Sequence, residues 1–449
     1  MNLDRMNRID RMDRDSVHPV PLPSLLPTWL MIRLFSTLLF LLSSSTLRAA
    51  DGDWPMWRGL KGDGTTAETG FPTHWTATEN VRWNTPIPGK GHSSPIVWGD
   101  RVFVTSAIEQ GDPAEPKDRL LLCIDRKDGR VLWQKTVVKA RLESLHKLNS
   151  RASSTPATDG ERVYVTFLDN PKVVVAAYDF AGNEVWTVSP GDFESVHGFC
   201  SPPILYKDLV IVNCDQDAFK KKKPAYIVAF DRTTGSERWR IDRTHRIRSY
   251  CPPLIVEAAG RMQMVLTGAE TVASYDPDTG KPLWTVDGPT EQFVASMVYS
   301  KGLFLLTAGY PTYHVMGIKP DGTGNVTKSH VAWHVENGGA GYVPSPVAYG
   351  DWVFLVHDNG QATCRDAATG KLRWMERLGK HHSASPVCAE GRLYFTDDDG
   401  TTWVVKARDK FELIEKNPIG EECYASPAFS KGEIFIRGLK QLYCIGAKR

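Results

Sequence analysis

The sequence predicts an all-β fold, an eight-bladed β-propeller of four-stranded antiparallel blades, from two recurring patterns and their spacing. The first pattern is Asp-x-x-x-Gly-x-x-x-Trp, found at Asp125–Trp133, Asp231–Trp239, Asp276–Trp284 and Asp366–Trp374, and one residue shorter at Asp179–Trp186. Successive copies lie about 40–50 residues apart, a period typical of propeller blades and solenoids. Each copy is predicted to form a strand, an Asp/Gly turn and a second strand that contains the Trp.

The second pattern is a small residue followed by Pro, placed before an alternating, β-rich run. Proline is tolerated at the first residue of a strand, where its missing N–H costs little. The pattern occurs eight times, with Met replacing Pro once: Ser94-Pro95, Thr155-Pro156, Ser201-Pro202, Cys251-Pro252, Ser296-Met297, Ser345-Pro346, Ser385-Pro386 and Ser426-Pro427. Eight openings predict eight inner strands, one for each blade.

The two patterns are offset at the ends of the chain. Trp83 precedes the first opening, whereas the last repeat ends at Leu442–Ile445 without a Trp. We therefore expect Val81–Asn84 to pair as the outer strand of the blade that begins at Ser426. This N-terminal strand closes the ring and removes an edge that would otherwise stay open.

Two repeats are irregular. Phe411–Ile414 stands where the seventh blade would carry a Trp, and the insertion Pro320–Lys328 precedes Trp333 in the fifth. A seven-bladed ring with one misassigned repeat is the alternative. A short helix is predicted over Val138–Leu148, where leucines fall on one face.

The repeats run continuously, so residues 51–449 are predicted to form one propeller domain. The formal net charge is +2, which provides no bulk electrostatic case for binding nucleic acid. The run Lys220–Lys223 is expected to lie in a solvated loop.

The N-terminus predicts export. Leu34–Leu42 is apolar, follows Arg33 and is followed by a Ser-rich stretch that ends at Ala49-Ala50, as in a secretory signal peptide. We expect residues 1–50 to be leader and signal peptide, with cleavage after Ala50 and a periplasmic or secreted product. Translation starts either at Met1 or at Met31. The apolar run is too short for an ordinary membrane span, so an integral membrane protein is not expected.

The chain has eight cysteines, and export makes disulfides feasible. Cys200 and Cys251 precede consecutive blades and are either paired or buried as thiols. Cys123, Cys364 and Cys444 occupy third strands, where a small core side chain is expected. Because no Cys-x-x-Cys occurs, a structural zinc ribbon is excluded, and no metal site is predicted.

The Asp-x-x-x-Gly-x-x-x-Trp phrase and the Ser-Pro openings resemble the pyrroloquinoline-quinone-type (PQQ-like) β-propeller repeat family. That family includes quinoprotein alcohol dehydrogenases and a non-enzymatic outer-membrane assembly propeller. The segments Trp54–Gly59, His146–Ser150, Tyr342–Pro346 and Ala425–Pro427 are similar to secreted, mostly uncharacterised members. The resemblance covers the chain after Asp53.

For a quinone enzyme, the resemblance implies an adjacent Cys-Cys pair, a carboxylate and amide set for Ca²⁺, and an Asp base. No two cysteines of this chain are adjacent. The acidic run Asp397–Asp399 is expected to be a solvated hairpin turn. We therefore expect no cofactor, with PQQ and Ca²⁺ required only under the alternative of a PQQ-dependent oxidoreductase.

A ligand site is predicted at the channel mouth, in the segments just before the openings. Its proposed residues are Lys90, His92, Asn149, Arg151, His197, Arg248, Tyr342 and His381, with Tyr250, Gln292, His382, Glu421 and Glu422 nearby. Cationic and hydrogen-bonding groups from several blades would suit an anionic or sugar-like ligand. The alternative is that these groups only hydrogen-bond neighbouring blades and channel water. Trp54 and Trp57 are expected to hold the N-terminal segment against the ring.

No Gly-x-Ser-x-Gly elbow or Walker-type phosphate loop occurs, and no catalytic residue is predicted. The sequence thus favours an exported, non-catalytic propeller that binds an unknown anionic or sugar-like ligand or a cell-envelope protein. A quinone-dependent oxidoreductase, or another enzyme that uses the same funnel, is the alternative.

Overall fold

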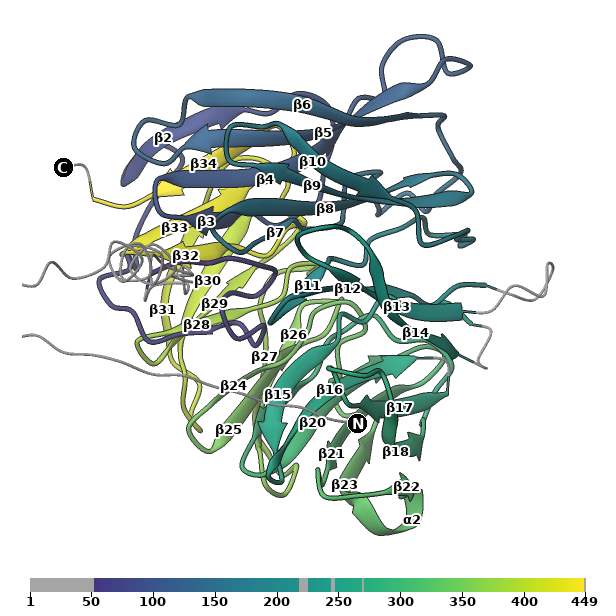
Figure 1. Cartoon of the computed structure of the whole chain (residues 1–449). Helices are drawn as coiled ribbons and strands as arrows, with labels where there is room; N and C mark the ends of the chain where they lie inside the picture. Colours follow the sequence, from purple (N-terminus) through teal and green to yellow (C-terminus); the bar gives the residue numbers. More distant parts are fainter. Residues whose placement is uncertain (1–51, 218–224, 244–246, 269, 448–449) are drawn as a thin grey trace, which may run out of the picture. The chain divides into compact units, whose positions relative to one another are not determined.

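A computed structural model describes residues 52–217, 225–243, 247–268 and 270–447. In this part of the chain, eight four-stranded antiparallel blades form a ring, the eight-bladed propeller that the repeats predict (Figure 1). Two of the blades carry one further short strand in parallel orientation. The seven-bladed alternative is wrong. Residues 1–50, for which a leader and signal peptide were predicted, and Lys220–Lys223 lie outside the described residues.

In blades 1 to 7 the four strands follow in chain order from the innermost to the outermost, and in blade 8 the outermost strand comes from the N-terminal side of the chain. Blades 1 to 4 consist of β3 (Ile96–Trp98), β4 (Arg101–Ala107), β5 (Lys117–Asp125) and β6 (Val131–Ala140); β7 (Ala157–Thr158), β8 (Arg162–Asp169), β9 (Lys172–Asp179) and β10 (Glu184–Val188); β11 (Ile204–Tyr206), β12 (Leu209–Cys214), β13 (Ala225–Asp231) and β14 (Glu237–Arg243); and β15 (Leu254–Ala258), β16 (Arg261–Gly268), β17 (Thr271–Tyr275) and β18 (Pro282–Asp287).

Blades 5 to 8 repeat this plan. Their strands are β19 (Val298–Ser300), β20 (Leu303–Gly309), β21 (Tyr313–Ile318) and β23 (Val331–Glu336); β24 (Val347–Tyr349), β25 (Trp352–Val356), β26 (Gln361–Asp366) and β27 (Leu372–Arg377); β28 (Val387–Ala389), β29 (Arg392–Thr396), β30 (Thr401–Lys406) and β31 (Leu413–Pro418); and β32 (Ala428–Ser430), β33 (Glu433–Arg437), β34 (Gln441–Ile445) and β2 (Val81–Pro86). The second and third strands are almost wholly buried, so the core lies between adjacent blades.

The ring is closed by the N-terminal strand, as predicted. Strand β2 pairs antiparallel with β34, from Val81 opposite Ile445 to Pro86 opposite Gln441, and the two strands lie side by side in Figure 1. The indole of Trp83 then reaches blade 1, where its N–H donates to the carbonyl of Arg126 at 2.8 Å. One Trp therefore joins the last blade to the first.

The Trp and Gly of the repeated phrase contact each other across blades. A Cβ added to Gly235 would lie 2.8 Å from the indole of Trp186 in the preceding blade, and the φ of +72° also favours Gly at this position. The Trp186 N–H donates to the carbonyl of Arg232 in the same turn at 3.0 Å. The same stacking of an indole on a turn Gly occurs at Trp83–Gly129, Trp133–Gly182, Trp239–Gly280 and Trp333–Gly370. The phrase is thus a device for docking one blade on the next.

The contact from blade 4 to blade 5 is built differently, by the insertion in blade 5. The insertion contains β22 (Gly324–Asn325) and the short helix α2 (Thr327–His330), and β22 pairs parallel with the outermost strand β18 of blade 4. Trp284 of β18 is fully buried and donates to the side chain of Gln263 at 2.7 Å. An added strand replaces the Trp–Gly contact here.

The helix predicted over Val138–Leu148 does not form. Strand β6 continues to Ala140, which pairs with Lys117 of β5, and the following residues have no helical hydrogen bonding. The leucines do not form a buried face, because Leu148 is 45% exposed while Glu143 is buried. Arg119 holds the Glu143 carboxylate at 3.2 Å, and this buried ion pair sets the path of the segment.

All eight cysteines are free thiols, so Cys200 and Cys251 are not paired with each other. Cys123, Cys364 and Cys444 are fully buried in the third strands of their blades, as expected for small core side chains. No helix of the described residues is long and apolar enough to cross a membrane.

The N-terminal segment before the closing strand crosses the innermost strands. Trp54 is buried and bridges to Val97 of β3, and the carbonyl of Pro55 accepts from Thr158 of β7. On the opposite blades, Arg58 donates to the carbonyl of Pro346, and β1 (Thr65–Thr66) pairs parallel with β28. The segment therefore links blades 1, 2, 6 and 7 across the axis of the ring.

Candidate functional site

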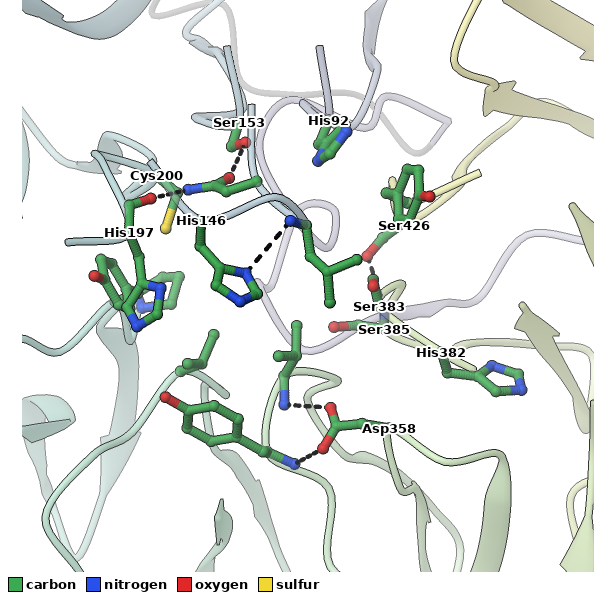
Figure 2. A pocket seen from close by; sticks show the side chains of 18 of the residues that line it. His92, His146, Ser153, His197, Cys200, Asp358, His382, Ser383, Ser385 and Ser426 are labelled. Atoms are coloured by element: carbon green, nitrogen blue, oxygen red, sulfur yellow. Dashed lines mark hydrogen bonds between the residues drawn. The ribbon is translucent and has the colours of Figure 1, made fainter. Parts of the chain in front are cut away.

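The channel mouth contains a cavity of about 620 Å³. All eight blades contribute to it, mostly through the segments just before their innermost strands. Its polar and aromatic lining residues are Trp57, His92, Ser94, His146, Asn149, Ser153, Thr155, His197, Cys200, Arg248, Tyr250, Gln292, Tyr310, Tyr313, Tyr342, Asp358, His381, His382, Ser383, Ser385, Tyr424 and Ser426. Figure 2 shows the labelled histidines and serines arranged around the open space, with Cys200 between His146 and His197.

Trp57 of the N-terminal segment is part of this lining. It also lines a second cavity of about 140 Å³, together with Met56, Leu60 and residues of blades 3 and 4. Trp57 therefore lies between the two cavities. The sequence analysis expected Trp54 and Trp57 only to hold the N-terminal segment against the ring.

Most of the residues predicted at the channel mouth do line the cavity. These are His92, Asn149, His197, Arg248, Tyr342 and His381, together with Tyr250, Gln292 and His382. Lys90, Arg151, Glu421 and Glu422 are not among the lining residues. Glu421 instead accepts from the hydroxyl of Tyr443 at 2.8 Å within blade 8.

Arg151 belongs to a buried ion cluster beside the cavity. Its Nη1 lies 2.6 Å from Oε1 of Glu109 and its Nε lies 3.3 Å from Oε2 of Glu143, which Arg119 also contacts. Lys90 is exposed and lies 3.7 Å from the other oxygen of Glu109. Both side chains therefore have carboxylate partners before any ligand arrives.

Arg248 lines the cavity but is also paired. Its Nη1 lies 3.0 Å from Oδ1 of Asp217, and Asp217 also accepts from the Arg248 backbone N–H at 3.3 Å. The convergent ring of free cations that the sequence suggested is therefore not what the lining presents. The positive charges of Lys90, Arg151 and Arg248 are each paired with a nearby carboxylate.

Two of the lining histidines, His92 and His197, are held in the neutral form. Burial, and then the nearby Arg437 and Lys90, lower the pKa of His92 to about 4, and its ring stacks on Tyr424 with centroids 4.6 Å apart. Burial, and then Arg248 and His146, lower the pKa of His197. At neutral pH each such imidazole has one N–H donor and one acceptor nitrogen.

Aromatic rings surround His197. The His146 ring meets it edge to face with centroids 5.2 Å apart, and Tyr250 does so at 6.0 Å. Tyr250 is hydrogen-bonded to the hydroxyl of Ser195, and burial raises its pKa well above the ordinary value. Burial also raises the pKa of the Cys200 thiol to about 12, so this sulfur is protonated and is a poor nucleophile.

Asp358 is a lining carboxylate that the sequence analysis missed. Its two oxygens accept from the backbone N–H groups of Val343 at 2.9 Å and Tyr342 at 3.1 Å, the two bonds drawn at Asp358 in Figure 2. Burial raises its pKa, and these N–H bonds act in the opposite direction. The Tyr342 hydroxyl in turn donates to Oε1 of Gln292 at 3.3 Å.

The openings that begin the inner strands form a hydrogen-bonded chain at the cavity. At four of the eight openings, the backbone N–H of the opening residue donates to the hydroxyl of the next blade's opening residue, at 2.9 Å in every case. The pairs are Ser94 to Thr155, Ser296 to Ser345, Ser345 to Ser385, and Ser385 to Ser426. Blades 3 and 4 instead present Pro202 and Pro252 to the cavity. The recurrent Ser thus has a structural role in joining blades.

The acidic run before Thr401 is not the solvated turn that was expected. Asp397 is 3% exposed and accepts from the N–H groups of Thr401 and Trp403, at 2.8 and 2.9 Å. Asp398 is 9% exposed and accepts from the backbone of Ser383 at 2.7 Å. These carboxylates shape the hairpin beside the cavity.

Several lining residues were missed because they lie in a second set of loops. Tyr310 joins β20 to β21 and Asp358 joins β25 to β26, so both follow a second strand and do not precede a first one. In an antiparallel blade these loops lie at the same end as the openings. Following the direction of each strand along the chain would have placed these loops at the channel mouth. His146 also lines the cavity, and it lies in the segment His146–Ser150, which the sequence analysis named for its family resemblance only.

The lining fits a quinone with Ca²⁺ poorly. Ca²⁺ takes 6–8 oxygen ligands, whereas the lining offers one carboxylate, that of Asp358, already bonded to two backbone N–H groups. The amide oxygens of Asn149 and Gln292 also accept hydrogen bonds from the protein already. Cys200 has no adjacent Cys in the sequence. The cavity thus differs from the site that the resemblance implies.

The family model described as outer membrane protein assembly factor BamB matches residues 60–170, 117–220, 171–323 and 323–410. No curated protein matches the chain. Similar solved structures include BamB from Moraxella catarrhalis, with a TM-score of 0.56, 13% identity, 81% of this chain and 98% of that chain covered.

Two similar structures are dehydrogenases. The quinohemoprotein alcohol dehydrogenase ADHIIG from Pseudomonas putida HK5 has a TM-score of 0.58 at 12% identity, covering 89% of this chain and 81% of that chain. A europium-containing methanol dehydrogenase has a TM-score of 0.52 at 13% identity, covering 87% and 91%. At these identities the structural likeness concerns the fold. Because the family model matches most of the sequence, this chain belongs to the BamB-type PQQ-like β-propeller family.

Proposed function

We propose that this chain is an exported, non-catalytic propeller that serves as a binding or assembly scaffold and takes a neutral, sugar-like ligand in the channel-mouth cavity. The observation that carries the proposal is the character of the lining, which combines aromatic rings with uncharged hydrogen-bonding groups. A concave, largely preformed cavity with a few convergent polar groups is the usual form of a small-ligand site.

The aromatic rings supply flat surfaces for a sugar. Trp57, Tyr250, Tyr310, Tyr342 and Tyr424 all line the cavity. The C–H faces of a sugar ring are weakly positive and pack against the negative faces of aromatic rings. Hydroxyls at the rim of the sugar require partners that both donate and accept.

The neutral polar groups meet that requirement. His92 and His197 each offer one donor and one acceptor at neutral pH, and Gln292 contributes an amide. An anion is less well served, because Arg248 is paired with Asp217, and Lys90 and Arg151 are not in the lining. Of the two ligand classes expected from the sequence, the lining therefore favours the sugar-like one.

The scaffold role is supported by the state of the reactive groups. Cys200 is a protonated thiol, and the Asp358 carboxylate is occupied by backbone N–H groups. A partner from the cell envelope is consistent with membership of a family described by an outer membrane protein assembly factor.

A matched pair of tyrosines tests the binding proposal. Tyr310 is 52% exposed and lines the cavity, whereas Tyr349 is 45% exposed on β24 and is not in the lining. Soluble oligosaccharides are screened by thermal shift, and those that stabilise the protein are titrated by calorimetry. We expect Tyr310→Ala to weaken binding by about 10-fold, the loss of roughly one stacked ring, and Tyr349→Ala to leave it unchanged.

Two outcomes would contradict the proposal. The first is that no oligosaccharide binds although small anions do. The second is that both tyrosine variants bind the oligosaccharide as tightly as the unaltered protein. Incubation with PQQ and Ca²⁺ tests the alternative, since dye-linked alcohol oxidation with a bound quinone would make the chain an oxidoreductase. Export is tested by fractionation of expressing cells and N-terminal sequencing, for which we expect Asp51 at the mature terminus.

A further inference from the structure

Blade 5 brings three side chains with metal-binding chemistry together at its outer edge. They are His314 on β21, and His334 and Glu336 on β23. One ligand atom from each lies within 4.8 Å of the other two. None of these residues lines the channel-mouth cavity, so this cluster is separate from the site described above.

The strand register explains the cluster. In the antiparallel pair, His314 lies opposite Glu336 and Met316 lies opposite His334. Residues two apart on a strand point to the same face, so His334 and Glu336 share a face with His314. The pleat of the sheet therefore directs the three side chains to one point.

The ring of His314 is held in a suitable orientation. Its Nε2 lies 2.6 Å from the hydroxyl oxygen of Thr312, and its Nδ1 lies 2.9 Å from Nε2 of His334. When Nε2 bonds to Thr312, Nδ1 is left to face the cluster. A hydrogen bond to the ring nitrogen that does not bind the metal fixes the orientation of a metal-ligating His.

We propose that His314, His334 and Glu336 bind a divalent transition metal of the Zn²⁺ class. Two imidazole nitrogens and one carboxylate oxygen are a common zinc donor set, and borderline-soft metals prefer imidazole over the all-oxygen sites of Ca²⁺ and Mg²⁺. His334 and Glu336 are exposed and β23 is the outermost strand of its blade. The fourth coordination position is therefore open to water or to a ligand from another molecule.

Zinc titration of the full chain tests the proposal. The protein is treated with EDTA, dialysed, and titrated with ZnCl₂ by calorimetry, and Co²⁺ absorption reports the coordination geometry. We expect one equivalent of tight binding that is lost in His334→Gln and in Glu336→Gln. Both positions are exposed, and melting of each variant in EDTA verifies that it is folded. Thr312→Val should weaken zinc binding by about 10-fold, because it removes the partner of His314.

His330→Gln is the matched control. His330 lies in the same blade, 3.4 Å from Asp321 and outside the cluster, so its loss should leave the zinc affinity unchanged. The proposal is overturned if the unaltered protein binds no zinc. It is also overturned if the His334 and Glu336 variants bind as the unaltered protein does, since zinc would then be held elsewhere, for example by the cavity histidines.

Discussion

The outer rim of the propeller and its channel mouth are built from the same repeat, but the rim repeats one contact whereas the mouth differs from blade to blade. At the rim, an indole stacks on a turn glycine of the next blade at five contacts, from Trp83 on Gly129 to Trp333 on Gly370. At the mouth, each blade presents a different side chain, such as His92, Arg248 or Tyr342. Residues that recur, the opening Ser and Thr included, build the ring, and residues that vary between blades give the cavity its distinct side chains.

This difference separates stability from binding. The rim contacts bury large aromatic surfaces and join the ends of the chain, so substitutions there should act on unfolding. The mouth residues lie in loops, and those that are partly exposed, such as Arg248, Tyr310 and Tyr342, should act on the ligand with little effect on the fold when they are substituted. Four predictions test the comparison.

The largest effect is expected at a rim tryptophan. Trp186→Ala removes a buried indole, its contact with Gly235 and its hydrogen bond to Arg232, and should lower the free energy of unfolding by about 3–5 kcal/mol. Val185 precedes it and is 43% exposed, so Val185→Ala should cost less than about 0.5 kcal/mol. Urea unfolding of both variants measures the difference. Equal, small losses would show that the indole does not hold the blades together.

A smaller effect is expected at the partner glycine. Gly235→Ala places a Cβ 2.8 Å from the Trp186 ring at a φ of +72°, whereas Gly260 has nearly the same φ, +73°, and nothing within 4 Å. The left-handed backbone alone should cost about 1–2 kcal/mol in both variants. Overpacking should add about 1–3 kcal/mol at Gly235 only. If both alanine variants unfold at the same denaturant concentration, the docking contact contributes nothing.

At the mouth, His92 should make stability depend on pH. Its folded pKa is about 4, below the ordinary 6.5, so between these values the unfolded chain takes up a proton that the folded chain does not. The free energy of unfolding therefore has its full value with respect to His92 above pH 6.5. It decreases as the pH falls toward 4, by up to about 3 kcal/mol. His92→Phe keeps a ring against Tyr424 without the titration. Unfolding at pH 7 and pH 4.5 should show a smaller loss in the variant, and an identical loss would contradict the assignment.

The smallest effect is expected at Lys90. It is exposed, and its partner Glu109 is also held by Arg151. Lys90→Ala should change stability by less than about 0.5 kcal/mol and leave oligosaccharide affinity unaltered. A clear loss of affinity in calorimetry would place Lys90 in the site after all and would favour an anionic ligand.

The fold could be predicted from the sequence because the contacts at the rim are made by residues that recur at a fixed spacing. The offset of Trp83 alone predicted that β2 closes the ring, and the structure has that pairing. The predicted helix failed because Glu143 is drawn into a buried ion pair with Arg119, a contact between residues far apart in the sequence. The spacing of apolar residues within one segment gives no information about such a contact.

The site was less predictable for the same reason. The segments before the openings could be identified by position, which placed His92 and Tyr342 in the lining. The pairing of their charges could not be predicted, because the partner of Arg248 is Asp217 and that of Arg151 is Glu109. Each of these carboxylates lies in the loop after the second strand of the preceding blade. Asp358 was missed because it lies in the loop after a second strand, which carries no Ser-Pro signal.

The most direct test measures stability and oligosaccharide affinity in the same two variants, Trp186→Ala and Tyr310→Ala. We predict a crossed result at a temperature where both remain folded: Trp186→Ala loses stability and keeps its affinity, while Tyr310→Ala keeps its stability and loses affinity. If each variant loses both properties to a similar extent, the rim and the mouth are not separate, and the division between structure and binding is wrong.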